Sequence, residues 1–190
     1  MNAAVQPARA AEAARPRAAA PTAVEPAQYL TFMLAGEVFA IGILAIKEII
    51  EYHSLTEVPM MPASVRGVIN LRGAVVPVMD LLARFGRPSS VVTKRSCIVI
   101  VEVESDADEA RQVIGVVVDA VNEVLDIAPA DIEPPPSFGA RIRGDFIHGM
   151  GKVKDKFVIL LDARHVLSLD DVDAAALPPL PQLDIAAAVH

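Results

Sequence analysis

The chain of 190 residues has a single cysteine, Cys97, no tryptophan and only 4% aromatic residues. One thiol excludes an internal disulfide framework and a metal site built from several thiolates. A lone thiol is typical of proteins in a reducing cytosol. The scarcity of aromatic rings argues against a platform on which bases stack, and the net charge of −7 argues against a surface for phosphate backbones. We therefore expect no nucleic-acid partner.

The sequence also lacks an apolar run long enough to cross a membrane. Its most apolar stretch near the N-terminus, residues 43–50, is interrupted by Lys47 and Glu48. The first residues carry arginines but no continuous apolar stretch, so a signal peptide is not expected. We expect no direct insertion into a membrane.

Composition divides the chain into three parts. Residues 1–27 are mostly Ala, Pro, Arg and Glu, which predicts a disordered leader. Residues 170–190 form an acidic, proline-containing tail. The part between them, residues 28–169, carries most of the apolar residues and is expected to form one folded domain.

Short apolar segments separated by turn residues dominate that domain. They predict four hairpins, formed by 29–34 with 38–41, 67–71 with 74–79, 96–103 with 113–118, and 147–153 with 157–161. Helical signals are brief and fall at 43–47, 81–85 and 163–167. Many short strands with regular turns predict an all-β fold with short helices, either barrels or a sandwich.

An internal repeat is also visible. The same number of residues separates Gly67 from Asp80 and Gly149 from Asp162. Each glycine opens a hairpin, and each aspartate ends an apolar strand and is expected to cap the helix that follows. A second echo relates the stretches that follow Gly42 and Gly115, namely 46–51 and 121–126. We infer that the chain contains two related units.

No constellation of residues supports catalysis. The four histidines lack the close helical spacing of a zinc site, and no glycine-rich phosphate loop is present. Cys97 has no evident histidine partner. Asp80 and Asp119 each follow an apolar strand, but neither stands in the small hydroxyl-glycine turn of an aspartic protease. We expect no enzyme and no cofactor, and a small-barrel enzyme that uses this aspartate pair is the rival interpretation.

One polar segment stands out between two apolar strands. Asn70, Arg72 and Gly73 suit a tight turn, and Gly73 permits the positive φ angle that such a turn needs. Arg72 could project its planar guanidinium onto a partner, or it could bind a carboxylate of its own fold. The residues alone leave both alternatives open.

At this segment the chain resembles the CheW family of chemotaxis coupling proteins. The resemblance covers about residues 28–169, and several motifs in the same order make it specific. In chain order these motifs are residues 43–49, Asn70-Leu71-Arg72-Gly73 with 75–81, then 113–119, 146–151 and 158–162.

The resemblance implies a fold and a function. The fold would be two five-stranded SH3-like or OB-like β-barrels on a shared hydrophobic core, as two intertwined lobes with a boundary near 86–95. The function would be that of a non-enzymatic scaffold adaptor. It would couple the cytoplasmic hairpin tips of chemoreceptors to the regulatory domain of a CheA-type histidine kinase. The protein would then be cytoplasmic and peripheral to membrane-anchored receptor arrays. An alternative is a chemosensory pathway that controls something other than flagellar motility.

The resemblance also implies which residues bind the receptor: Ile46, Glu48, Asn70, Arg72, Cys97 and Val121. Turns and caps are assigned to Gly67, Gly73, Asp80, Gly115, Gly149 and Asp162. Cys97 departs from the family pattern, in which an aliphatic residue is more usual. The loop at 104–112 is longer and more acidic than in compact members of the family.

Overall fold

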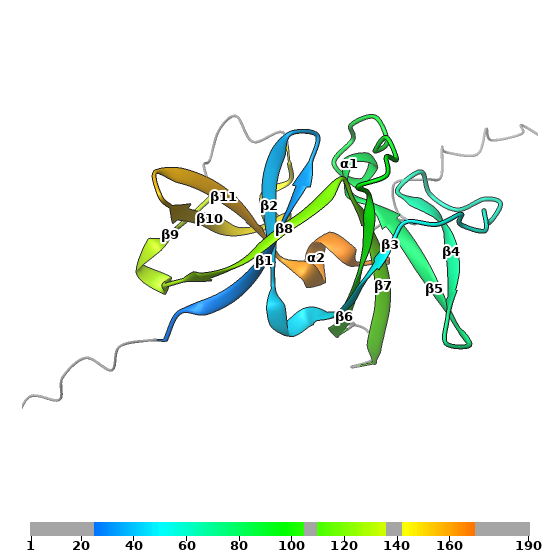
Figure 1. The fold of residues 1–190 in the computed structure, drawn as a ribbon, viewed down its shortest axis with the longest axis horizontal. Coiled ribbons are helices and arrows are strands. Elements are labelled where there is room, and N and C mark those ends of the chain that lie inside the picture. The colour runs from blue at the N-terminus through cyan, green and yellow to red at the C-terminus, as the bar shows by residue number, and fades with distance from the viewer. Residues whose placement is uncertain (1–24, 105–109, 136–141, 170–190) are drawn as a thin grey trace, which may run out of the picture.

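The computed structural model describes residues 25–104, 110–135 and 142–169 (Figure 1). The expected acidic tail and all but the last residues of the expected leader lie outside this part of the chain. Strands dominate, and the only α-helices among the described residues are α1 (Leu81–Arg84) and α2 (Ala163–Leu167). The mostly-β fold with short helices is thus confirmed. No helix in the described ranges is long and apolar enough to span a membrane.

The strands form two sheets. The first has the order β8-β1-β2-β11-β10-β9, and the second has the order β3-β6-β7-β5-β4. The strands of the first sheet are β1 (Ala27–Leu34), β2 (Glu37–Gly42), β8 (Ala120–Ile127), β9 (Ile132–Glu133), β10 (Ile147–Val153) and β11 (Lys156–Leu161). Those of the second are β3 (Ile46–Glu51), β4 (Val65–Leu71), β5 (Ala74–Asp80), β6 (Cys97–Glu104) and β7 (Arg111–Val118). The second sheet has the expected five strands, and the first gains a sixth because the two-residue strand β9 pairs with β10.

The two sheets repeat one topology. The order β8-β1-β2-β11-β10 matches β3-β6-β7-β5-β4, and in each sheet two hairpins are joined through one parallel pair, β11 with β2 or β5 with β7. All four expected hairpins are present. We call β1–β5 the first half of the chain and β6–β11 the second half. The first sheet joins the hairpin β1–β2 to strands of the second half, and the second sheet joins the hairpin β6–β7 to strands of the first half. The two halves therefore exchange hairpins.

The expected helix at 43–47 is only partly present. Ile43–Ala45 form a single 3-10 turn, but Ile46 already pairs with Val101 at the start of β3. Branched side chains favour strands, and pairing with β6 offers this segment more hydrogen bonds than one extra helical turn would. Strand β3 and its counterpart β8 lie outside the four predicted hairpins.

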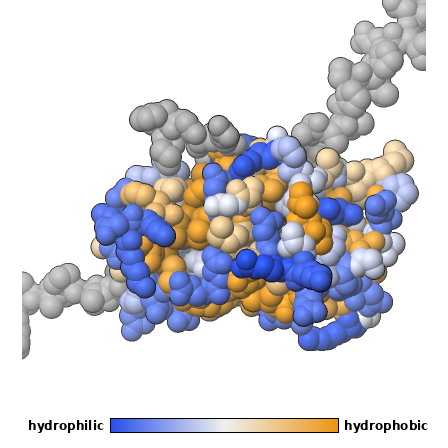
Figure 2. All heavy atoms as spheres, turned by 45° about the horizontal axis from the view of Figure 1, so that its top comes forward, coloured by the Kyte–Doolittle hydropathy of each residue, from blue (hydrophilic) through white to orange (hydrophobic). Residues whose placement is uncertain are grey.

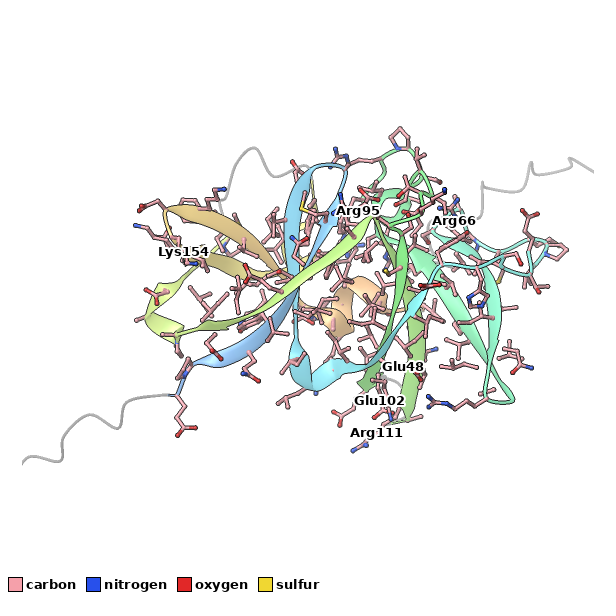
Figure 3. The ribbon with its side chains drawn as sticks, in the orientation of Figure 1. Glu48, Arg66, Arg95, Glu102, Arg111 and Lys154 are labelled. Carbon is pink, nitrogen blue, oxygen red and sulfur yellow. The ribbon has the colours of Figure 1, made fainter. Side chains whose placement is uncertain are left out.

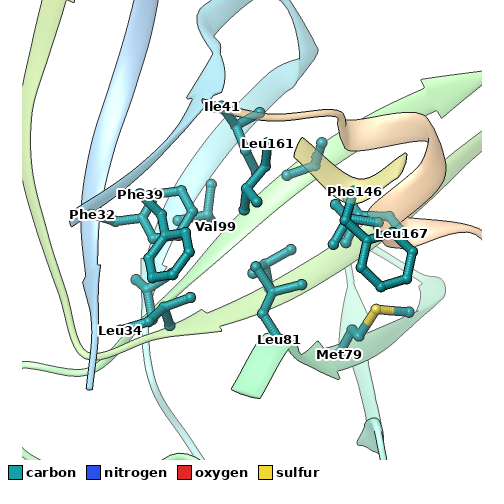
Figure 4. Packing of buried hydrophobic residues seen from close by; sticks show 14 of the residues in the cluster. Phe32, Leu34, Phe39, Ile41, Met79, Leu81, Val99, Phe146, Leu161 and Leu167 are labelled. Atoms are coloured by element: carbon teal, nitrogen blue, oxygen red, sulfur yellow. The ribbon is translucent and has the colours of Figure 1, made fainter. Parts of the chain in front are cut away.

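A shared hydrophobic core joins the two sheets, as expected. The first sheet contributes Phe32 and Phe39, the second contributes Val99, and the helices add Leu81 and Leu167 (Figure 4). A smaller apolar cluster lies within each sheet. The lobes consequently share one large core in addition to the smaller cluster that each of them buries by itself.

Four phenylalanines form a row through that core. The ring centroids are 6.4 Å apart for Phe32 and Phe39, 5.9 Å for Phe39 and Phe85, and 6.2 Å for Phe85 and Phe146. The guanidinium of Arg84, which follows β5, lies 5.1 Å from the Phe146 ring centroid. It also donates to the carbonyl oxygens of Val166 and Ser168 at the end of α2. The phenylalanine row and Arg84 therefore connect α1, which follows β5, to α2, which follows β11.

Two aspartates begin the two α-helices. Asp80 accepts hydrogen bonds from the backbone N–H groups of Leu82 and Ala83, and Asp162 accepts from those of Arg164 and His165. These carboxylates satisfy donors that a helix leaves unpaired in its first turn. The environments differ, because Asp80 is fully buried whereas Asp162 is partly exposed.

Gly67 lies where the chain leaves room for no side chain. Its φ angle is +152°, and a Cβ atom there would lie 2.5 Å from the carbonyl oxygen of Thr56. Thr56 is fixed by two backbone hydrogen bonds to Val68, at 3.0 and 2.8 Å, which cover part of the edge strand β4. We predict that Gly67→Ala lowers the free energy of unfolding by about 2 kcal/mol, through strain and overpacking.

Urea denaturation measures this loss, and Gly42→Ala is the matched control. Gly42 has a φ of −55° and open space where its Cβ would stand. Its replacement should change the free energy of unfolding by less than about 0.5 kcal/mol. Equal effects of the two substitutions would show that the segment around Thr56 moves aside without cost.

Candidate partner-binding surface

The turn between β4 and β5 presents Arg72 outward. Arg72 and Gly73 have φ angles of +52° and +89°, as in the type I′ turn that matches the twist of a hairpin. The side-chain oxygen of Asn70 accepts a hydrogen bond of 2.8 Å from the backbone N–H of Gly73 and closes the turn. The side chain of Arg72 remains 79% exposed. Asn70 and Gly73 thus shape the turn, and Arg72 is available at its surface.

Arg72 forms an ion pair with Glu48. Its Nη2 atom lies 3.0 Å from Oε2 of Glu48, which belongs to β3 on the opposite edge of the same sheet. An exposed pair of this kind contributes at most about 1 kcal/mol to stability. It holds the side chain in place, while a guanidinium still has further donors to offer a partner. The ion pair with a carboxylate of its own fold is therefore confirmed, and binding of Arg72 to a partner stays a prediction.

The apolar site residues lie along the margin of the shared core. Ile46, Cys97 and Val121 are half-buried and pack against the core from β3, β6 and β8, so both sheets contribute to this margin. The thiol of Cys97 donates to the carbonyl oxygen of Arg95 at 3.5 Å. Strand β3 carries both Ile46, which is part of the apolar margin, and Glu48, which forms the ion pair with Arg72.

Ile49 is a further exposed residue at this margin that the sequence did not indicate. It pairs with Val99 of β6 but remains 44% exposed, because β3 is an edge strand. Residues 46–51 read Ile-Lys-Glu-Ile-Ile-Glu, which lacks the strict alternation of a half-buried strand, so the sequence carries little local signal for this position. Figure 2 shows that apolar atoms reach the molecular surface between hydrophilic side chains. We define the partner surface as Ile46, Glu48, Ile49, Arg72, Cys97 and Val121.

Ion pairs border this surface near the C-terminal end of β6. Glu102 pairs with Lys47 of β3 and with Arg111 of β7, so it links three neighbouring strands (Figure 3). The hydrogen bond from Lys47 holds the pKa of Glu102 below its usual range, and the charge of Arg111 acts in the same direction. Glu102 therefore stays ionised to a lower pH than an unpaired glutamate.

The rival interpretation as an aspartic enzyme gains no support. Asp80 is fully buried and accepts hydrogen bonds from α1 and from Ser90, whereas Asp119 accepts a 2.7 Å bond from the backbone N–H of Ala35. Each carboxylate thus serves the backbone of a different segment, and no hydrogen bond joins the two. Among the residues that the structure describes, no group of His, Cys, Asp or Glu side chains is placed to hold a metal ion.

Comparison with known proteins gives consistent matches. A family model described as "CheW-like domain" matches residues 28–171. The chemotaxis protein CheW of Rhizobium meliloti (strain 1021) is 32% identical over 148 residues, which is 78% of this chain and 92% of that protein. That of Bacillus subtilis (strain 168) is 30% identical over 146 residues, covering 77% and 90%.

A solved structure agrees with these relatives. The scaffolding protein TtCheW from Thermoanaerobacter tengcongensis superimposes with a TM-score of 0.67 at 33% sequence identity. The match covers 81% of this chain and 96% of that one.

Proposed function

This chain belongs to the CheW-like family, and from that premise we propose that it works as a non-enzymatic scaffold adaptor in chemotaxis signalling. One surface would bind the cytoplasmic hairpin tip of a chemoreceptor, and another would bind the regulatory domain of a CheA-type histidine kinase. The protein would act in the cytoplasm, at the periphery of membrane-anchored receptor arrays. It would need no cofactor.

The arrangement around Arg72 is the observation that supports this proposal most. A receptor tip is a helical hairpin with an apolar face and polar flanks. The margin of Ile46, Cys97 and Val121 offers apolar contacts from both sheets, and the Arg72–Glu48 pair beside it offers both charges for fixing the register of a helix. Because the margin lies where the sheets meet, the receptor would contact both lobes at once.

Scaffolding by this protein requires no conformational change of its own. If receptor and kinase bind separate surfaces, a scaffold that carries the receptor and the kinase together raises the effective concentration of each partner near the other. The shared core and the row of phenylalanines keep the two lobes in one arrangement, so the spacing between the surfaces is fixed. Coupling would then depend on simultaneous occupancy.

We predict that Arg72→Ala weakens binding to a receptor tip fragment by about tenfold or more while it leaves kinase binding unchanged. The substitution removes the exposed guanidinium and frees Glu48 but touches no core residue. Isothermal titration of the receptor fragment and of the kinase regulatory domain measures both affinities. Arg95→Ala is the control, because Arg95 is an exposed cation outside the partner surface.

The two failures of this prediction have different meanings. A matching loss of kinase affinity, or a clear fall in melting temperature, would make Arg72 a structural residue. Absence of binding to either partner by the folded wild-type chain would refute the proposed function itself.

A further inference from the structure

The tip of the β10–β11 hairpin gathers positive charge on an acidic chain. Residues 152–157 contain Lys152, Lys154, Lys156 and Phe157 and only one acidic residue, whereas the whole chain has a net charge of −7. All three lysines are exposed, and Phe157 is 52% exposed. Figure 3 shows Lys154 toward one end of the long axis of the molecule, away from Glu48. The tip is therefore a basic and apolar projection outside the partner surface defined above.

The lysines of the tip have no carboxylate partner within the described ranges. Several arginines elsewhere are paired, as Arg72 is with Glu48 and Arg87 is with Glu37 at 3.0 Å. The described residues contain only two other cations without an ion pair, Lys94 and Arg95. An exposed ammonium group needs no partner for stability. Lys152 pairs with Phe157 across the hairpin, so the two side chains share one face, and with Lys154 at the turn they form a surface that suits an anionic, partly apolar ligand.

The turn at this tip holds an unfavourable backbone conformation. Lys154 and Asp155 have φ angles of +47° and +63°, and neither is glycine. The corresponding turns of the β1–β2 and β4–β5 hairpins place glycine second, at Gly36 and Gly73. Aspartate tolerates this conformation better than most residues, but lysine does not. The turn is thus tight, and its backbone conformation fixes where the Lys154 side chain leaves the hairpin.

The internal repeat relates this tip to the turn that carries Arg72. The β-bulges at Gly67 and Gly149 are equivalent, since each follows the first residue pair of its hairpin. Counting from these glycines, Lys154 corresponds to Arg72 and Phe157 corresponds to Val75, which is 71% exposed. Both tips therefore combine a cation at positive φ with an exposed apolar residue three positions later. Arg72 is paired with Glu48, whereas Lys154 has no such pair.

We propose that the β10–β11 tip is a second docking surface, which binds an acidic segment of another protein that carries at least one apolar side chain. The lysines would bind its carboxylates, and Phe157, which shares a face of the hairpin with its cross-strand partner Lys152, would contact its apolar group. A nucleic acid or an anionic membrane suits the tip less well, because the net charge of −7 repels an extended anionic surface. Asp155 within the tip and Glu133 on β9 beside β10 add to that repulsion.

Fluorescence anisotropy on the full chain tests this proposal. The probe is a short labelled peptide of alternating glutamate and leucine, and the same peptide with glutamine in place of glutamate is its control. We expect the triple variant Lys152→Gln, Lys154→Gln, Lys156→Gln to bind the acidic peptide about tenfold more weakly, since each exposed ion pair contributes a modest share. Phe157→Ser should weaken binding several-fold. The matched control, Lys94→Gln with Arg95→Gln, should change the affinity less than about twofold.

The outcomes separate this inference from the proposed function, on which it does not depend. Equal binding of the acidic and glutamine peptides, or equal loss in the triple variant and the matched control, would overturn it. So would tighter binding to a duplex oligonucleotide or to phosphatidylserine vesicles that is lost in the triple variant. Circular dichroism and titration with the kinase domain show whether each variant remains folded and whether the scaffold function persists.

Discussion

Replacing Asp80 with alanine should lower the free energy of unfolding by about 3–5 kcal/mol. Asp80 is fully buried, and its carboxylate accepts hydrogen bonds from the backbone of Leu82 at 3.0 Å and from the backbone and hydroxyl of Ser90 at 2.7 and 2.9 Å. The guanidinium of Arg66 lies 3.5 Å away as its counter-charge. The substitution would leave buried donors unpaired and a partly buried cation without its partner. It would also release the connection that Ser90 anchors between the two halves of the chain.

Asp162→Ala is the control that the repeat provides. Asp162 occupies the equivalent position and caps α2 in the same way, but it is partly exposed and accepts only local bonds from Arg164 and His165. Its loss should destabilise the protein by about 1 kcal/mol, the usual contribution of an N-cap. Urea denaturation of both variants measures the difference. If the two losses were equal, the buried network of Asp80 would contribute nothing beyond helix capping.

The second large effect is expected for Phe39→Ala, at about 3–5 kcal/mol. Phe39 has no exposed surface and stands between Phe32 and Phe85 in the row of aromatic rings. Removing its ring opens a cavity in the core that both sheets share, so both lobes should lose stability together in a single transition. Thermal unfolding followed by circular dichroism at several wavelengths tests the cooperativity.

Phe157→Ala is the matched control for this substitution. Phe157 is 52% exposed, and its removal should change the free energy of unfolding by less than about 1 kcal/mol. Two separate transitions in the Phe39→Ala variant, one unchanged from wild type, would show that the lobes unfold independently and that the shared core does not couple them.

Local signals explain which parts of the fold are predictable from the sequence. Hairpins are marked by turn residues between apolar segments, as at Arg72-Gly73, and helix starts are marked by Asp80 and Asp162. The edge strands β3 and β8 carry a weaker signal. Their exposed faces mix charged and apolar residues, and their pairing depends on neighbours far along the chain.

The candidate site shows the same limit. The turn chemistry of Asn70 and Gly73 is legible in the sequence, because their roles depend on residues nearby. The ion pair of Arg72 with Glu48 depends on how the second sheet brings β3 to the β4–β5 turn, which no local pattern encodes. The exposure of Ile49 likewise results from the position of β3 at the edge of its sheet.

The exchange of hairpins has a consequence for how the protein is made. On the ribosome, β1 and β2 emerge first, but their sheet neighbours β8 and β11 belong to the second half of the chain. The last strand within the described residues, β11, pairs in parallel with β2. The sheet that contains β2 and Phe39 therefore cannot be completed until most of the domain has been synthesised. We expect this protein to fold largely after translation rather than one lobe at a time during translation.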